Sequence, residues 1–341
     1  MKHKSVMITG ASGFIGGHIA RRLAEEGCTV FALYRREIPP AHLEELEERG
    51  GVLVQADLSD GPSLRENKDF TAALAGSDGI VHAAAKTGDW GREKEFVRSN
   101  FDPTRRLFEA ARAAGCRSFV YISSIAVHGF GNHRDTAEEG PYYPYINPYQ
   151  WTKKRAEEFV LEQNTEEMKT TAVRPGNAYG PGDTTTMFPI FDAMERGLMG
   201  YLGYGETLTC PVYIDDLADA VIRALESEKS GGEAFNIVSD EKVTWKDLLE
   251  TSAQLLGIPA PKVHLSPFVS KCAAGLLSAV YHAFFIRHAP PITFYRVHQL
   301  INNYDFSNEK AKRLLGYSPK TGLRTGLQRT VEDYLKRRSP A

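Results

Sequence analysis

The sequence contains few cysteines for its 341 residues, and they follow no metal-ligand pattern. No two of them form a CxxC pair, and the ten histidines show no spacing typical of metal ligands. This scarcity argues against a structural zinc site and favours reduced thiols in a cytoplasmic protein. We therefore expect no bound metal. The four cysteines are Cys28, Cys116, Cys210 and Cys272.

The sequence also lacks a dominant charge and an apolar leader. Its formal net charge is −2, so charge offers no case for nucleic-acid binding. The apolar stretch after Lys4 ends at Gly10, which is too short for the core of a signal peptide and indicates a first β-strand. Hydrophobic residues make up 42% of the chain and charged residues 25%, as in an ordinary soluble enzyme.

The most informative stretch follows this strand directly. The β-type run Val6–Thr9 leads into three glycines spaced three apart, and an amphipathic helix pattern continues from Phe14 to about Glu26. This order leaves the bare N–H groups and positive dipole end of a helix N-terminus available to a dinucleotide pyrophosphate. The alternative is an ordinary glycine-rich turn. The expected contact residues are Gly10, Ser12, Gly13, Phe14, Ile15 and Gly16.

Apolar runs alternate with helical patterns through the first half of the chain. This rhythm predicts an α/β fold with a doubly wound parallel sheet of the Rossmann type, in which ligands gather at the carboxyl ends of the strands. The expected helices include Arg98–Ala114 and Tyr149–Gln163. The expected strands are Val6–Thr9, Thr29–Tyr34, Val52–Ala56, Gly79–Ala84, Phe119–Ser123 and Thr171–Arg174.

The rhythm breaks after Arg174, where a turn-rich segment follows. Further along, Val212–Glu226 and Glu233–Val238 are interpreted as a helix and a strand that return to the sheet. The chain is therefore divided into a dinucleotide-binding domain and a smaller, mainly helical C-terminal substrate lobe. The domain comprises residues 1–175 plus 212–240, and the lobe comprises residues 176–211 and 241–341.

A tyrosine and a lysine begin the second helical pattern. Tyr149 and Lys153 lie four residues apart, so both head groups face one ligand, although about one such pair is expected by chance. Ser123 and Ser124 end the preceding strand, where capping is the ordinary interpretation. Together these residues suit hydride transfer. Tyr149 exchanges a proton with the reacting oxygen, Ser124 hydrogen-bonds that oxygen, and the Lys153 ammonium lowers the pKa of the tyrosine.

The order of these motifs resembles the extended short-chain dehydrogenases/reductases over essentially the whole chain. One departure is that Phe101-Asp102-Pro103 follows Asn100 where the family usually has a Gly-Thr pair, and proline is tolerated in a first helical turn. The motifs are Gly10-x-x-Gly13-x-x-Gly16, Asp57-Leu58, His82-Ala83-Ala84-Ala85, Asn100, Ser123-Ser124, Tyr149-x-x-x-Lys153, Arg174-Pro175 and Asp215-Asp216-Leu217.

The resemblance implies further cofactor contacts and a homodimer through the helices near Arg98–Ala114 and Tyr149–Gln163. Asp57 and Leu58 would contact the adenine, Asn100 would support the edge of the active site, and Lys153 would hold the nicotinamide ribose. The other residues that it places around the cofactor are Ala83, Ala84, Ala85, Lys86, Ser123, Tyr149, Pro175, Gly176 and Asn177.

The end of the second strand bears on the choice of dinucleotide. An acidic residue there usually binds the ribose hydroxyls of NAD, whereas this sequence has Arg35 and Arg36. Two guanidinium groups suit a 2′-phosphate, so NADP is favoured. A solvated basic turn, with NAD as cofactor, is the alternative.

The substrate is expected to be lipophilic. Ile125 and Ala126 follow Ser124 where dehydratases have an acidic pair, and residues 207–212 lack the arginine with which nucleotide-sugar enzymes hold a diphosphate. Residues 82–91 and 149–161 resemble the 3β-hydroxysteroid branch, which includes sterol dehydrogenases and reductases of 2-alkyl-3-oxoalkanoates. We expect an oxidoreductase that interconverts a secondary alcohol and a ketone. The alternatives are a nucleotide-sugar epimerase with tightly bound NAD and a cofactor-sensing regulator.

The apolar run Cys272–Ile286 fits this expectation. It is shorter than the about 20 apolar residues that span a membrane. We favour a buried helix of the substrate lobe over peripheral contact with a bilayer surface. Trp90 and His128 are candidates to face the substrate, or to serve only in packing.

Overall fold

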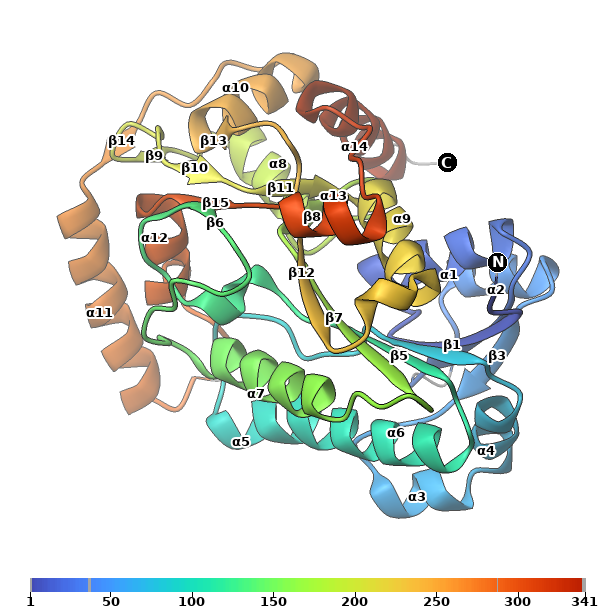
Figure 1. The fold of residues 1–341 in the computed structure, drawn as a ribbon. Helices are drawn as coiled ribbons and strands as arrows, with labels where there is room; N and C mark the ends of the chain where they lie inside the picture. Colours follow the sequence, from blue (N-terminus) through green and yellow to red (C-terminus); the bar gives the residue numbers. More distant parts are fainter. Residues whose placement is uncertain (1, 36–37, 287, 339–341) are drawn as a thin grey trace.

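A computed structural model describes residues 2–35, 38–286 and 288–338, and its centre is a seven-stranded parallel sheet (Figure 1). The strand order is β12-β7-β5-β4-β1-β2-β3, so the chain reverses direction of winding between β1 and β4. A crevice between the carboxyl ends of these two strands is the usual ligand position in such sheets. The strands are β1 (Ser5–Thr9), β2 (Thr29–Tyr34), β3 (Val52–Gln55), β4 (Gly79–His82), β5 (Ser118–Ile122), β7 (Lys169–Pro175) and β12 (Glu233–Ile237).

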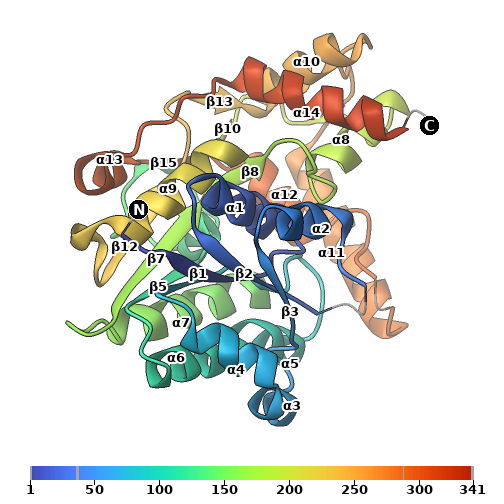
Figure 2. The same ribbon diagram turned by 90° about the vertical axis from the view of Figure 1, so that its right-hand side faces the viewer.

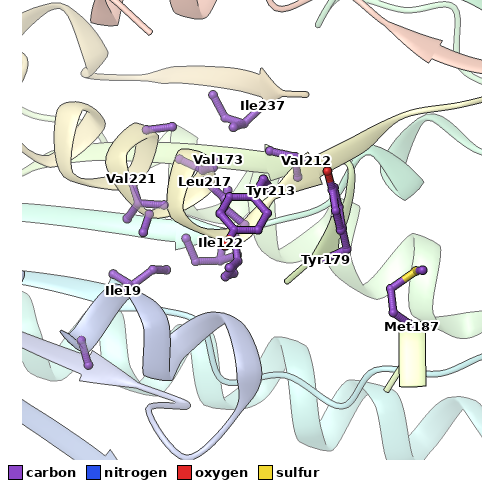
Figure 3. Close-up of a cluster of buried hydrophobic side chains, with 14 of the residues drawn as sticks. Ile19, Ile122, Val173, Tyr179, Met187, Val212, Tyr213, Leu217, Val221 and Ile237 are labelled. Carbon is purple, nitrogen blue, oxygen red and sulfur yellow. The ribbon is translucent and has the colours of Figure 1, made fainter. Parts of the chain in front are cut away.

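Helices cover both faces of the sheet (Figure 2). One face carries α1 (Phe14–Glu25), α2 (Ala41–Glu48) and α9 (Ile214–Glu226). The other carries α3 (Gly61–Glu66), α4 (Lys68–Ala75), α5 (Glu93–Phe96), a π-helical turn η1 (Val97–Phe101), α6 (Asp102–Ala113) and α7 (Pro148–Glu162). Each layer buries its own apolar cluster, and Figure 3 shows Ile19 of α1 and Leu217 of α9 in the first of them, with Val173 of the sheet.

The remaining elements gather along the top and left of Figure 1. They include four two-stranded sheets, of which β6–β15 pairs segments that are far apart in the sequence. The helices are α8 (Met187–Glu195), α10 (Trp245–Leu256), α11 (Pro267–Ala283), α12 (Phe294–Ile301), α13 (Glu309–Leu315) and α14 (Leu323–Arg338), with 3₁₀ turns η2 (Ile125–His128) and η3 (Glu228–Ser230). The strands are β6 (His133–Thr136), β8 (Asn177–Tyr179), β9 (Tyr201–Leu202), β10 (Leu208–Thr209), β11 (Pro211–Tyr213), β13 (Val243–Thr244), β14 (His264–Leu265) and β15 (Tyr304–Phe306).

The predicted Rossmann-type sheet is confirmed, including the late strand β12, which pairs parallel to β7. The prediction of a helix over Val212–Glu226 is wrong at its start, because Pro211–Tyr213 pairs with β8 and the helix begins at Ile214. The apolar run Cys272–Ile286 is also not a buried helix. Ser270 and Ala274 are the buried residues of the helix α11 that contains most of it.

A buried ion pair connects the sheet to α7. Glu157 of α7 accepts hydrogen bonds from Arg174 of β7, at 2.8 Å from Nε and 2.7 Å from Nη2, and one from the Ser123 hydroxyl at 2.6 Å. Arg174 lowers the pKa of Glu157 against the effect of burial, so the carboxylate stays charged. A bidentate pair with its remaining acceptor positions satisfied is the geometry that offsets the cost of burying two charges.

We expect Glu157→Gln to lower the free energy of unfolding by about 3–5 kcal/mol, because it leaves the buried Arg174 guanidinium without a counter-charge. Urea unfolding measures the loss. Glu109→Gln is the control, since Glu109 pairs with Arg105 at 3.8 Å on the exposed surface of α6, and it should cost less than about 1 kcal/mol. Equal losses in the two variants would contradict this account of the buried pair.

Candidate active site

The glycine turn between β1 and α1 is shaped by two close contacts. Gly10 has φ of +71°, and a Cβ there would lie 2.7 Å from the backbone nitrogen of Ala84. A Cβ on Gly16 would lie 2.1 Å from the carbonyl oxygen of Gly10. Both positions therefore require glycine. Gly13 is the N-cap of α1 and no side chain caps it, so the first N–H groups of the helix are available to an anion.

This turn fits a dinucleotide phosphate. Ser12, Gly13 and Phe14 also line a groove of about 870 Å³ that extends toward Pro181 and Gly182. The groove contains none of the predicted catalytic residues, so it borders the phosphate position rather than the reacting centre. Among the described residues, no cluster of three or more His, Cys, Asp or Glu side chains is arranged to hold a metal ion.

The predicted catalytic residues meet at the carboxyl ends of β5 and β7. Ser124 caps η2, where its hydroxyl accepts a hydrogen bond from the Ala126 N–H at 3.1 Å. Tyr149 lies in the first turn of α7. The Asn147 side chain caps the N-terminus of this helix by accepting a hydrogen bond from the Gln150 N–H at 3.1 Å. A hydrogen bond with Ser124 lowers the pKa of Tyr149, but burial raises it more. The phenol is thus held in its proton-bearing form beside the serine.

Lys153 is anchored to the end of β5. Its ammonium group donates to the Ile122 carbonyl oxygen at 2.7 Å and lies 4.7 Å from the centre of the Tyr121 ring. Burial lowers the pKa of Lys153 to about 7. Burial dominates the pKa of Tyr149 in this arrangement, and the lowering of that pKa by Lys153 stays a prediction.

A chain of hydrogen bonds links the glycine turn to α7 through His82. The Ala84 N–H donates to the Thr9 hydroxyl, which bonds His82 Nδ1 at 2.6 Å. His82 Nε2 bonds the Thr104 hydroxyl at 2.9 Å, and that hydroxyl donates to the Asn100 carbonyl oxygen. These partners assign the proton to Nε2. Burial lowers the pKa of His82 to about 3, which keeps the ring neutral.

Asn100 continues this chain into the loop after β4. Its side-chain oxygen accepts the Lys86 N–H at 2.7 Å, and its amide nitrogen donates to the Lys86 carbonyl at 3.2 Å and to Thr152 of α7 at 3.4 Å. The loop of Ala83, Ala84 and Ala85 is thereby fixed beside the glycine turn. The Lys86 side chain forms an ion pair with Glu95.

Several predicted cofactor residues make protein contacts that limit their roles. Ser123 donates its hydroxyl proton to Glu157, and the Asp57 carboxylate bonds both the N–H and the hydroxyl of Ser59. Leu58 is buried. The Asn177 side chain bonds Thr209 at 2.7 Å and Gln299 at 3.1 Å.

Two other groups complete the predicted set. Pro175 is buried at the end of β7, and Gly176 leaves no room for a side chain, since a Cβ there would lie 2.2 Å from the Cys210 carbonyl oxygen. Arg35 is exposed after β2. Arg36 falls outside the described residues.

The sequence did not reveal the wall opposite Tyr149. Burial raises the pKa values of Tyr295 of α12 and Tyr304 of β15, and both lie close enough to Tyr149 for its charge to add to that rise. They pack with Phe130, Cys210 and Ile125 in an apolar cluster next to Ser124. No local pattern signals these residues, because the chain brings them to the site from distant segments of the lobe.

The family of the chain follows from its sequence over the same elements. Residues 6–238 match the NAD dependent epimerase/dehydratase family. The chain belongs to this family. The predicted membership of the extended short-chain dehydrogenases/reductases is confirmed, and with it the prediction of an enzyme built around a dinucleotide site.

Named relatives match nearly the whole chain. The 2-alkyl-3-oxoalkanoate reductase of Stenotrophomonas maltophilia (strain K279a) is 29% identical over 336 residues, covering 95% of this chain and 97% of the relative. The sterol-4-alpha-carboxylate 3-dehydrogenase, decarboxylating, of Mus musculus is 29% identical over 346 residues, covering 98% and 91%.

Solved structures share the fold. The crystal structure of gox2253 has a TM-score of 0.80 at 27% identity and covers 98% of this chain and 99% of its own. MoeE5 in complex with UDP-glucuronic acid and NAD has a TM-score of 0.72 at 26% identity, with the same coverage. The second of these structures thus contains a UDP-sugar and NAD on the same fold.

We expect Gly16→Ala and Gly13→Ala to separate folding from dinucleotide binding. The first forces a methyl group into the Gly10 backbone, so both thermal stability and binding should fall. Gly13 has an ordinary φ of −95°, and a Cβ at this position would lie 3.3 Å from the Gly10 carbonyl oxygen, so the second substitution fits the backbone. It should change stability by less than about 1 kcal/mol while weakening dinucleotide binding measured by titration calorimetry. Wild-type affinity in Gly13→Ala would show that the phosphate lies elsewhere.

Proposed function

We propose that this enzyme is an NADP-dependent oxidoreductase that interconverts a secondary alcohol and a ketone on a lipophilic substrate of the sterol or 2-alkyl-3-oxoalkanoate type. The observation that carries the proposal is the wall beside Tyr149, which consists of the buried Tyr304, the partly buried Tyr295 and apolar side chains. Such a wall favours a hydrocarbon body and leaves a few polar groups to orient one oxygen.

The residues of the site have distinct tasks in this reaction. When bound, the dinucleotide supplies or takes up the hydride. Tyr149 carries the proton to the ketone oxygen, Ser124 holds that oxygen, and burial keeps the phenol protonated until transfer. The low pKa of Lys153 lets this group release or accept a proton near neutral pH, which suits resupply of the tyrosine.

The relatives support the same class of substrate, since their names specify a 2-alkyl-3-oxoalkanoate and a sterol carboxylate. A nucleotide-sugar epimerase is the second candidate, because the solved structure of MoeE5 contains a UDP-sugar and NAD. Against it, residues 207–212 contain no arginine for a diphosphate, and Cys210 of this segment is buried in the apolar wall.

The deciding experiment follows consumption of NADPH and NADH with a 3-ketosteroid, a long-chain 2-alkyl-3-oxo acid and a UDP-sugar. Turnover of either lipophilic ketone with NADPH supports the proposal and selects its branch. Interconversion of the UDP-sugar without added dinucleotide, together with silence on both ketones, overturns it in favour of the epimerase.

We expect Tyr149→Phe to lower turnover at least about 100-fold while NADP affinity stays within about twofold, because the substitution removes the proton donor only. Tyr204→Phe is the control, since it removes the same hydroxyl from an exposed surface tyrosine. Steady-state kinetics and titration calorimetry measure the two effects. Turnover near that of the control would rule out Tyr149 as the donor.

We expect Arg35→Asp to weaken NADP at least about tenfold and to leave NAD nearly unchanged, because the new carboxylate repels a 2′-phosphate and the lost guanidinium no longer binds it. Arg196→Asp makes the same charge change at the exposed end of α8. Dissociation constants for both dinucleotides decide the matter. An unchanged NADP/NAD ratio would refute the assignment of NADP.

A further inference from the structure

Helix α11 presents an apolar stripe to solvent. Phe268 is 75% exposed, Leu276 69% and Phe284, just after the helix, 74%. The positions between them on the same side are apolar as well, because residues 269, 272, 276, 279, 280 and 283 fall on one face at helical spacing. These are Val269, Cys272, Leu276, Ala279, Val280 and Ala283. We call this surface, with Phe268 and Phe284, the α11 stripe.

The α11 stripe does not pack against the rest of the molecule, because α11 contacts the protein through its opposite face. Its buried residues are the small Ser270 and Ala274. Tyr281 lies edge-on to Trp90 with ring centres 6.1 Å apart, and α12 runs alongside the helix. In Figure 1, α11 forms the left margin of the molecule, with its outer side turned away from the sheet.

The segment around the stripe has an unusual distribution of charge. Residues 251–304 contain no Asp or Glu, although the chain has 43 of them, and they contain two lysines, two arginines and four histidines. Lys271 lies on α11 next to the stripe at helical spacing and is exposed, so it supplies the positive charge beside the stripe. Asp89 of another segment pairs with Arg296 at 2.8 Å, so its charge offsets that arginine and not Lys271.

We propose that the α11 stripe docks on the surface of an anionic lipid bilayer. The helix would lie in the plane of the interface, with its phenylalanines and leucine among the acyl chains and Lys271 at the headgroups. None of the described helices is long and apolar enough to cross a membrane. An exposed apolar face with a flanking lysine and no acid fits the pattern of such interfacial helices.

A second copy of the chain is the less suited occupant. An isologous contact through the stripe would bring together two acid-free helices that each carry Lys271. The homodimer predicted by resemblance uses α6 and α7, which lie along the bottom of Figure 1 rather than at its left margin. A bilayer also suits the lipophilic substrate of the proposed function. Trp90 donates to the Ile286 carbonyl at 3.3 Å, so the segment just after the stripe contacts the loop that follows β4.

Cys272 gives a direct probe of the stripe, because it is exposed whereas Cys28, Cys116 and Cys210 are buried. We would attach an environment-sensitive fluorophore to it and add vesicles of phosphatidylglycerol and phosphatidylcholine, or of phosphatidylcholine alone. We expect a blue shift and co-sedimentation with the anionic vesicles, weaker binding to neutral ones, and loss of binding at high salt. This readout needs no turnover, so it is independent of the proposed function.

Variants identify the surface that binds. Leu276→Ser with Phe284→Ser should weaken binding to anionic vesicles at least about tenfold, and Lys271→Glu should weaken it less. Ile38→Ser, which alters an equally exposed apolar side chain before α2, should have no effect. Absence of vesicle binding, or equal binding by the double variant and the control, overturns the proposal. Burial of the probe without lipid, with a doubled mass in solution, overturns it in favour of a second copy.

Discussion

The ion pair between Glu157 and Arg174 fixes the geometry on which the rest of the site depends. Glu157 lies one turn beyond Lys153 on α7 and accepts the Ser123 hydroxyl, while Arg174 immediately precedes Pro175. The pair therefore holds the ends of β5 and β7 and the first half of α7 in one arrangement. Arg174 also donates to the Nε2 atom of His128 at 3.0 Å, and burial lowers the pKa of that imidazole to about 3. The neutral ring then adds no third charge to the centre.

Burial, more than any single partner, sets the acid–base character of this region. It raises the pKa of Tyr149 and lowers the pKa values of Lys153 and His82, and each shift favours the neutral form. Because the pKa of His82 is lower in the folded protein than in the unfolded chain, the unfolded chain takes up this proton first as the pH falls. The contribution of His82 to the free energy of unfolding is therefore fully present above about pH 6.5 and is lost as the pH falls toward 3. Neutral Tyr149 and His82 beside an apolar wall fit the proposed substrate, which brings one polar oxygen and little else.

The sheet, the glycine turn and the meeting of Ser124 with Tyr149 were predictable from the sequence, because each rests on local patterns that parallel topology brings to one edge. The wall beside Tyr149 could not be predicted, since the fold of the lobe, and not a sequence spacing, brings Tyr295 and Tyr304 to it. The position of Lys153 depends on a carbonyl of β5 and leaves no trace in a tyrosine–lysine motif. The prediction that the run Cys272–Ile286 forms a buried helix was wrong, because an apolar sequence does not show which helix face packs against the protein.

The pairing of β6 with β15 has a consequence for how the molecule is made. His133 aligns with Tyr304, so this small ladder joins segments about half the chain apart. During synthesis the first strands and their crossover helices are available long before residue 304 emerges, whereas the ladder must wait for it. Tyr304 belongs to this late strand and to the wall opposite Tyr149. The dinucleotide half thus forms its contacts early, and the wall beside Tyr149 is the last part of the candidate site to assemble.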